Sequence, residues 1–225
     1  MTTATTQITD EQIQTEVQDE LRWDPAVRPA DVGVTVRDGV VTLTGWVDTY
    51  TKKWAAEQAA HRVRGVRAVA NDIEVRLPAS GERTDADIAA AVTRALETDA
   101  HLPIERLDVT VSKGWVTLRG SVEWQFQKND AGRVVRRLSG VRGVSNLLTV
   151  RPRQPVPDEL KRKIEDALIR NAETDAERIT VDVQGDKVIL KGTVRSWAAK
   201  RAAERTAWSS PGITEVDNRI TVSLT

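Results

Sequence analysis

The chain has 225 residues, no cysteine, and 33 basic against 33 acidic side chains, so its formal net charge is zero. Sequence-independent binding of nucleic acid needs an excess of Lys and Arg, so no nucleic acid partner is expected. A chain without cysteine forms no disulfide, thiolate metal site or cysteine nucleophile, and His61 and His101 are its only histidines. With 40% hydrophobic and 29% charged residues, the composition indicates a globular protein that is not an enzyme and uses no metal or cofactor.

The segment from Met1 to Asp10 has neither the basic stretch nor the apolar run of an export signal. No segment reaches the roughly 18 apolar residues that a membrane-spanning helix needs. We therefore expect a cytoplasmic protein, with a peripheral position at the inner membrane as the alternative.

One sequence unit occurs three times. The segment 34–45 recurs as 109–120 and as 181–192, at offsets of 75 and 72 residues. The same offsets relate two sets of single residues, Gly65, Gly140 and Gly212, and Asn71, Asn146 and Asn218. The chain is a tandem triplicate, with expected domains 8–77, 82–151 and 157–225, here named units one, two and three.

The first helix of each unit is predicted from apolar residues at i, i+4 and i+8. These triplets are Ile13, Val17 and Leu21, then Ile88, Val92 and Leu96, then Leu160, Ile164 and Leu168. Thr9 and Thr84 precede the first two of these helices and supply the side-chain oxygen that an N-cap needs.

Two strands, a second helix and a third strand follow in each unit. In unit one the alternating valines from Val34 onward predict two half-buried strands, and the Asp38-Gly39 pair suits the tight hairpin turn between them. An Ala-rich stretch from Lys52 to Arg64 predicts the second helix. Residues 69–75 predict a third strand, which a helical crossover makes parallel to one hairpin strand.

The predicted fold class is therefore α+β. Each unit has the order αββαβ and forms a two-layer sandwich, in which both helices cover one face of a three-stranded mixed sheet and the other face is open. Residues 78–81 form a short, pliable linker, whereas the proline-rich residues 151–157 are expected to be extended and semi-rigid, which would define the orientation of units two and three better.

The recurring pattern is Val-x-Val, Gly-Val-Val-x-Leu-x-Gly-x-Val, an Ala-rich helix, Gly-Val, and Val-x-Asn-x-Ile/Leu-x-Val. It resembles the BON domain, a bacterial module named for osmotically induced and nodulation proteins. The resemblance covers nearly the whole chain in three copies. It implies an αββαβ fold, no catalytic activity, and a stress-related role in attaching to phospholipid surfaces or to envelope partners.

Charge is segregated within each unit although the total is zero. The spans of the first helices are all net negative, whereas each second-helix span, at 48–67, 123–142 and 195–214, has a net charge of +3. Three interpretations stay open. The charged helix faces are solvated and pair locally, or the second helix contacts an anionic surface or a partner. In the third, the first helix of one unit contacts the second helix of the next, head to tail.

Aromatic and cationic residues gather where the second strand meets the second helix, a combination that suits an anionic membrane interface. The candidate lipid-binding or partner-binding residues are Tyr50, Lys53, Trp124, Phe126, Lys128, Arg133, Arg136, Arg137, Trp197 and Lys200. The alternatives are rings that staple the first helical turn and lysine stems that cover the core. Unit two, which contributes the six residues from Trp124 to Arg137, is the main candidate.

Trp46 and Trp115 are predicted by strand parity to lie on the open sheet face. Unit three has Lys187 and Thr193 at the equivalent positions, so its open face is expected to be solvated. A large ring on an uncovered face suggests docking. We therefore expect units one and two to associate through these faces, within the chain or in a dimer.

The leading hypothesis is a non-enzymatic binding or adaptor protein of bacterial stress or envelope maintenance, with an anionic membrane surface or an acidic partner on the second helices. A cytoplasmic protein–protein scaffold and a sensor of small ions or ligands are the alternatives. His61 is expected to be exposed and His101 to lie in a loop, and neither recurs between the units as a metal ligand would.

Overall fold

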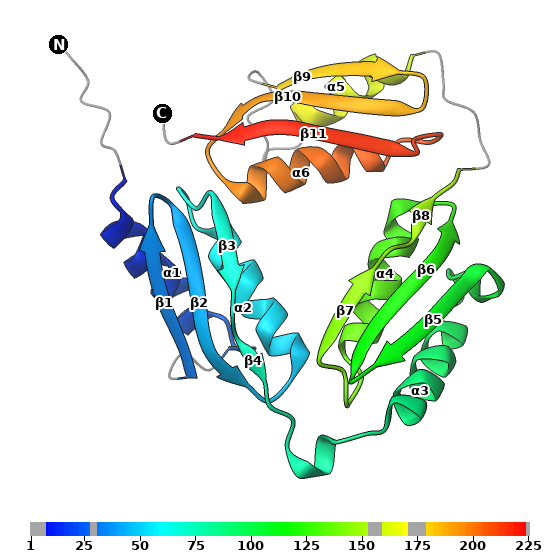
Figure 1. The fold of residues 1–225 in the computed structure, drawn as a ribbon. Helices are drawn as coiled ribbons and strands as arrows, with labels where there is room; N and C mark the ends of the chain where they lie inside the picture. Colours follow the sequence, from blue (N-terminus) through cyan, green and yellow to red (C-terminus); the bar gives the residue numbers. More distant parts are fainter. Residues whose placement is uncertain (1–7, 28–30, 153–158, 171–178, 224–225) are drawn as a thin grey trace.

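The computed structural model describes residues 8–27, 31–152, 159–170 and 179–223, which form three α+β units of two layers each (Figure 1). Unit one consists of two helices and four strands: α1 Asp10–Trp23, β1 Val32–Arg37, β2 Val40–Val47, α2 Tyr50–Arg62, β3 Ala68–Asn71 and β4 Glu74–Val75.

Unit two follows a single 3-10 turn, η2 Ala79–Gly81, and repeats this order. Its elements are α3 Asp85–Thr98, η3 Ile104–Arg106, β5 Leu107–Ser112, β6 Trp115–Val122, α4 Gln125–Arg136, β7 Gly143–Asn146 and β8 Thr149–Val150. Most of the proline-rich linker lies outside the described residues, so its expected stiffness stays a prediction. Unit three consists of α5 Leu160–Arg170, β9 Ile179–Gln184, β10 Lys187–Val194, α6 Trp197–Trp208 and β11 Glu215–Val222.

Each sheet has the second hairpin strand at its centre, which confirms the predicted mixed sheet. In unit one β2 pairs antiparallel with β1 and parallel with β3, and units two and three share this order. The third strand is divided into β3 and β4 in unit one and into β7 and β8 in unit two, whereas β11 is continuous in unit three.

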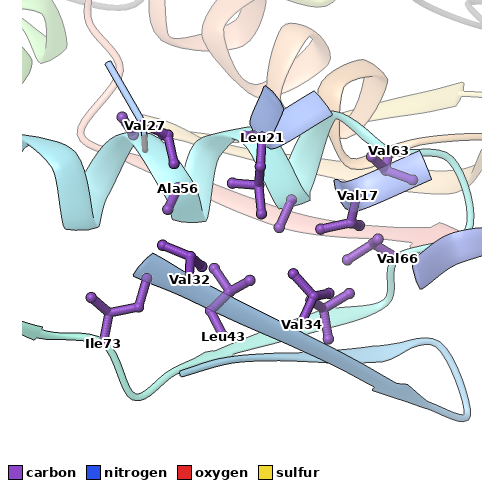
Figure 2. Packing of buried hydrophobic residues seen from close by; sticks show 14 of the residues in the cluster. Val17, Leu21, Val27, Val32, Val34, Leu43, Ala56, Val63, Val66 and Ile73 are labelled. Atoms are coloured by element: carbon purple, nitrogen blue, oxygen red, sulfur yellow. The ribbon is translucent and has the colours of Figure 1, made fainter. Parts of the chain in front are cut away.

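The core of each unit lies between the helix pair and one sheet face. In unit one, Val17 and Leu21 of α1 meet Val34 and Leu43 of the hairpin (Figure 2). Small, fully buried residues such as Ala56 let α2 approach the sheet closely. The apolar stripes predicted for the first helices are confirmed, because every residue of the three triplets is buried.

The first helix also fixes the hairpin. Thr9 forms a capping box with Gln12, as predicted for an N-cap. The Asp10 carboxylate then accepts hydrogen bonds from the turn amides of Asp38 and Gly39, at 2.7 and 2.9 Å. Asp38 and Gly39 both have positive φ, so their amide groups point toward α1.

The recurring asparagine ties the third strand to the second helix. The side-chain amide groups of Asn71, Asn146 and Asn218 donate to the backbone carbonyls of Lys53, Lys128 and Lys200, at 3.2, 2.6 and 3.2 Å. Each side-chain oxygen also accepts from the amide two residues further along. Asparagine is needed here because one side chain must donate and accept at once.

The three units surround a common centre, toward which α2 and α6 extend (Figure 1). Contacts between units link the second helix of one unit to the C-terminal end of the second helix of another, or to the residue that precedes its third strand. The second helices therefore carry the contacts between the units.

Candidate functional site

Units three and one meet through the first residue of α6. Trp197 packs against the core of unit one, and its indole N–H donates to the carbonyl of Arg67 at 2.9 Å. Its ring centroid lies 4.9 Å from that of His61, near the C-terminal end of α2. One turn further along α6, Arg201 donates a hydrogen bond to the Gln58 side chain. An aromatic ring inserted into the next unit closes this junction.

Units one and two meet in the same way, through Tyr50 at the first position of α2. The Tyr50 ring packs against the core of unit two, and burial raises the pKa of its hydroxyl despite a hydrogen bond from the Val144 backbone. Thr51 donates to the carbonyl of Arg136 at 2.9 Å. The Arg136 guanidinium lies 4.0 Å from the Trp54 ring centroid, a cation–π geometry.

Units two and three meet differently. The position equivalent to Tyr50 and Trp197 is Gln125, and no aromatic ring is available there to enter the next unit. Trp208 of α6 instead packs against the cores of both units. A cavity of about 840 Å³ lies between α4 and α6, and Trp54 of unit one also contributes to its wall.

The cavity wall is rich in arginine. Two guanidinium groups come from α4 and two from α6, namely Arg133, Arg136, Arg201 and Arg205. Burial lowers the pKa of Arg136, and the neighbouring charges of Arg137 and Arg201 act in the same direction. Burial likewise lowers the pKa of Arg201, with a further contribution from Arg205. Like charges therefore face one another across the junction.

Apart from the three lysines, the structure separates the predicted second-helix residues into two groups. Tyr50, Trp197 and Arg136 lie within junctions, where they contact neighbouring units. Phe126, Arg133 and Arg137 are exposed on α4, and Trp124 is half-buried beside them. These residues therefore do not form one continuous surface.

The recurring lysines of the second helix are half-buried. Lys200 donates to the carbonyl of Ile220 at 2.6 Å, and its ammonium nitrogen lies 5.2 Å from the Trp197 ring centroid. Burial lowers the pKa of Lys128. Lys53 occupies the same helix position and is also half-buried. This placement is the one expected if the aliphatic stems of the lysines cover the core.

Trp46 and Trp115 lie on the open sheet faces, as strand parity predicts. They are 42% and 49% exposed. The Trp115 indole donates to Ser145 at 2.8 Å, and Arg76 lies over the Trp46 ring. The expectation that units one and two associate within the chain through these faces is wrong, because these units meet through Tyr50 and Arg136 instead. Association between two chains stays a prediction.

Local pairing explains part of the charge segregation. In unit one, Arg62 of α2 binds Glu20 and Asp24 at 2.5 and 3.0 Å, so basic and acidic helices pair within one unit. His61 is half-buried rather than exposed, which corrects the sequence interpretation. It is covered by Trp197 from unit three, a contact that the pattern of unit one alone does not contain.

Sequence reasoning missed several residues of the cavity and junctions, among them Trp54, Arg201, Arg205 and Trp208. A signal was present for three of these four. Trp54, Asn129 and Arg201 occupy one repeat position, and His61, Arg136 and Trp208 occupy another. Helix positions that differ in chemistry between otherwise matching repeats mark surfaces that face different neighbours.

Among the residues that the structure describes, no helix combines the length and the apolarity needed to cross a bilayer. Comparison with curated proteins finds osmotically-inducible protein Y of Escherichia coli (strain K12), 27% identical over 124 residues. The match covers 53% of this chain and 62% of that protein, so this chain spans less than two thirds of its relative.

Solved structures give a weaker likeness. CdsD, a structural protein of the type III secretion system of Chlamydia trachomatis, is 13% identical with a TM-score of 0.26, over 93% of this chain and 91% of that one. The C-terminal domain of CdsD is 12% identical with the same TM-score, over 93% of this chain and 96% of that one. A TM-score of 0.26 is too low to support an inference about the three units.

The family comparison is decisive, since the BON domain matches residues 9–76, 84–152 and 158–223. These three segments coincide with the αββαβ sandwiches described above and include nearly the whole chain. The protein therefore belongs to the BON domain family, and its chain carries three BON domains in tandem.

Proposed function

We propose that this protein is a non-enzymatic binding protein of bacterial osmotic or envelope stress, and that it contacts anionic phospholipid surfaces through the second helix of unit two. The family and the relative named for osmotic induction support the stress-related part. The proposal assigns no catalytic residue and no cofactor.

The exposed edge of α4 carries the lipid part of the proposal. Phe126 is 48% exposed, and Arg133 and Arg137 are exposed as well. Residues 126, 133 and 137 are seven and then four positions apart, so they share one face of the helix. An apolar ring flanked by cations suits the boundary between acyl chains and anionic headgroups.

Electrostatic attraction sets the scale of this contact. Each Lys or Arg near an anionic surface contributes about 1 kcal/mol before salt screening. Arg133 is held by Asp130 at 2.8 Å, so its contribution is smaller than that of Arg137. Binding is therefore weak and salt-sensitive, and the insertion of Phe126 is needed to stabilise it.

Co-sedimentation with liposomes tests the proposal. Vesicles of phosphatidylglycerol and of phosphatidylcholine are compared at low and at physiological salt, with wild type and a Phe126→Ser, Arg133→Gln, Arg137→Gln variant. The matched control is Lys161→Gln with Arg162→Gln on α5, which removes the same number of charges from another exposed helix. We expect binding to phosphatidylglycerol alone, lost in the α4 variant and kept in the control.

Absence of binding to either vesicle would end the lipid proposal and favour a protein–protein scaffold. The exposed rings of Trp46 and Trp115 support that second candidate, because large rings on an uncovered sheet face are typical of protein contacts. Its test is the sedimentation velocity of Trp46→Ala and Trp115→Ala. If both variants keep the oligomeric state and the stability of wild type, self-association through these faces is excluded.

A further inference from the structure

The cavity between α4 and α6 has the size of a ligand site. Its volume of about 840 Å³ falls within the range of roughly 300 to 1,000 Å³ that small-molecule pockets occupy. Its wall is built from all three units, since Trp54 comes from unit one, Arg136 from unit two and Arg205 from unit three. The cavity exists only when the units are docked.

The cavity wall carries more positive than negative charge. Four guanidinium groups stand against two carboxylates, Asp130 and Glu204. Each carboxylate also has a partner within its own unit: Asp130 binds Arg133 at 2.8 Å, and Glu204 accepts a hydrogen bond from Asn218 at 3.1 Å. The acidic groups of the wall therefore offset the arginines only in part.

Carboxylates offset the repulsion between these arginines only in part. Burial lowers the pKa of Arg136 and of Arg201, although the charge of Glu57 acts on both groups, and that of Glu204 on Arg201, in the opposite direction. Arg136 also contacts the Trp54 ring at 4.0 Å, and Arg133 binds Asp130 within α4. A ligand with several anionic oxygens is suited to that position, because guanidinium groups bind such oxygens in pairs.

Aromatic rings form the other part of the wall. Trp54, Trp124, Phe126 and Trp208 all line the cavity. Rings of this kind stack on planar groups of a ligand, and such stacking is tolerant of the exact planar group. The combination of guanidinium groups and rings selects a ligand that is anionic at one end and planar at the other.

We infer that the cavity between α4 and α6 is a binding site for a small phosphorylated molecule with a planar ring, held by Arg136, Arg201 and Arg205 and stacked on the tryptophans. A soluble ligand can occupy this site whether or not the protein binds vesicles, so the inference goes beyond the proposed function. Such a ligand contacts units two and three across the junction that contains the cavity.

Titration calorimetry of the full chain at low salt tests this inference. The probes are adenosine 5′-monophosphate, which carries both groups, adenosine, which lacks the phosphate, and inorganic phosphate, which lacks the ring. We expect the nucleotide to bind at least tenfold more tightly than either fragment. Binding also changes the tryptophan fluorescence, because three of the seven tryptophans line the cavity.

Matched variants locate the site. Arg205→Gln, alone and with Arg201→Gln, is expected to weaken nucleotide binding about tenfold per arginine, which is the loss of one charge-assisted hydrogen bond. Arg119→Gln removes an exposed arginine from β6 and leaves binding unchanged. If a variant folds poorly, phenylglyoxal labelling of wild type decides instead. The nucleotide then protects Arg136, Arg201 and Arg205 and leaves Arg119 reactive.

Three results would overturn the inference: no binding of the nucleotide at millimolar concentration, equal binding of the nucleotide and one of its fragments, or equal loss in Arg119→Gln and Arg205→Gln. The vesicle experiment separates this failure from that of the lipid proposal. Vesicle binding that depends on Arg137 stands without the cavity, because Arg137 does not line it, and nucleotide binding that depends on Arg205 stands without vesicles.

Discussion

The junction of units three and one and the junction of units two and three use the same helix positions and close differently. Trp197 is the first residue of α6 and packs against the core of unit one. Gln125 is the first residue of α4, and a cavity of about 840 Å³ lies beside it. The cores behind these positions follow one pattern. Repeated units thus keep the residues that fold each unit and diverge at those that decide how the units meet.

A substitution at a position that the three units share is expected to have the largest effect on stability. Gly120 has a φ of 118°, and a Cβ placed there would lie 2.0 Å from the carbonyl oxygen of Arg106. Gly120→Ala is therefore expected to destabilise unit two by about 3 kcal/mol or more, through strain and a backbone clash. Hydrogen exchange resolved by segment should show lost protection in unit two, with the contact of Trp197 retained.

Gly185→Ala is the matched control for this change. Gly185 also has positive φ, but nothing lies within 4 Å of a Cβ placed there. Its φ of 62° lies in the left-handed region that other residues enter at a modest cost, and no clash is present, so the control should cost about 1 kcal/mol. Equal costs for the two variants would mean that the close approach of Arg106 is not the reason that position 120 requires glycine.

Breaking a closed junction gives the next effect. Trp197→Ala removes the ring from the core of unit one and leaves the carbonyl of Arg67 without its indole donor. We expect a loss of about 2 kcal/mol in the docking of unit three, from apolar burial and one hydrogen bond. Small-angle scattering should detect an increased radius of gyration as unit three separates.

The control for Trp197→Ala is a substitution at the equivalent position of unit two. Gln125→Ala changes the equivalent position of unit two, where no ring enters a neighbour, and should cost less than about 0.5 kcal/mol. If Gln125→Ala were as damaging as Trp197→Ala, the two junctions would not differ in the way described.

The sequence was sufficient to predict each unit and insufficient to predict how the units meet. The spacing of Ile13, Val17 and Leu21 reports burial against the unit's own sheet, and all three are buried. This pattern is local and occurs three times, so an error in the prediction for one unit is corrected by the other two. The hairpins, the parallel third strand and the α+β class follow from it.

The candidate site depended on contacts over long distances in the chain. Tyr50 and Trp197 were recognised as unusual rings, but a membrane, a helix staple and a neighbouring unit all suit such a ring, and only the fold selects the last. The arginines of the cavity come from helices about 70 residues apart. Single-unit periodicity contains no information on which faces these helices turn toward each other.

A ring added at the junction of units two and three is expected to fill its cavity. Gln125→Tyr places at the start of α4 the ring that Tyr50 supplies in unit one. We expect it to pack against unit three and stabilise the chain by about 0.5 to 1 kcal/mol, as cavity-filling substitutions do. The measurements are thermal unfolding and titration with adenosine 5′-monophosphate, whose binding should weaken as the cavity fills. Unchanged values in both would place Gln125 outside the junction.

Acid pH should loosen the closed junction of units three and one, with the smallest effect of these experiments. Burial lowers the pKa of His61 below its ordinary value of 6.5, opposed by the charge of Glu57 and reinforced by that of Arg201. Its ring lies against Trp197, and its Nδ1 is buried without a hydrogen-bond partner. The docked chain therefore resists a proton that the unfolded chain accepts.

The stability that neutral His61 provides is thus complete above pH 6.5 and falls as the pH drops from there through the lowered pKa. Thermal unfolding measured from pH 7.5 to pH 5 should show a steeper loss in wild type than in His61→Phe, which keeps a ring against Trp197 and cannot be protonated. His101 is exposed and present in both proteins, so it does not contribute to the difference between them. Parallel curves for the two proteins would show that His61 stays neutral at no cost to the junction, and the acid sensitivity would then have to come from the carboxylates of the units themselves.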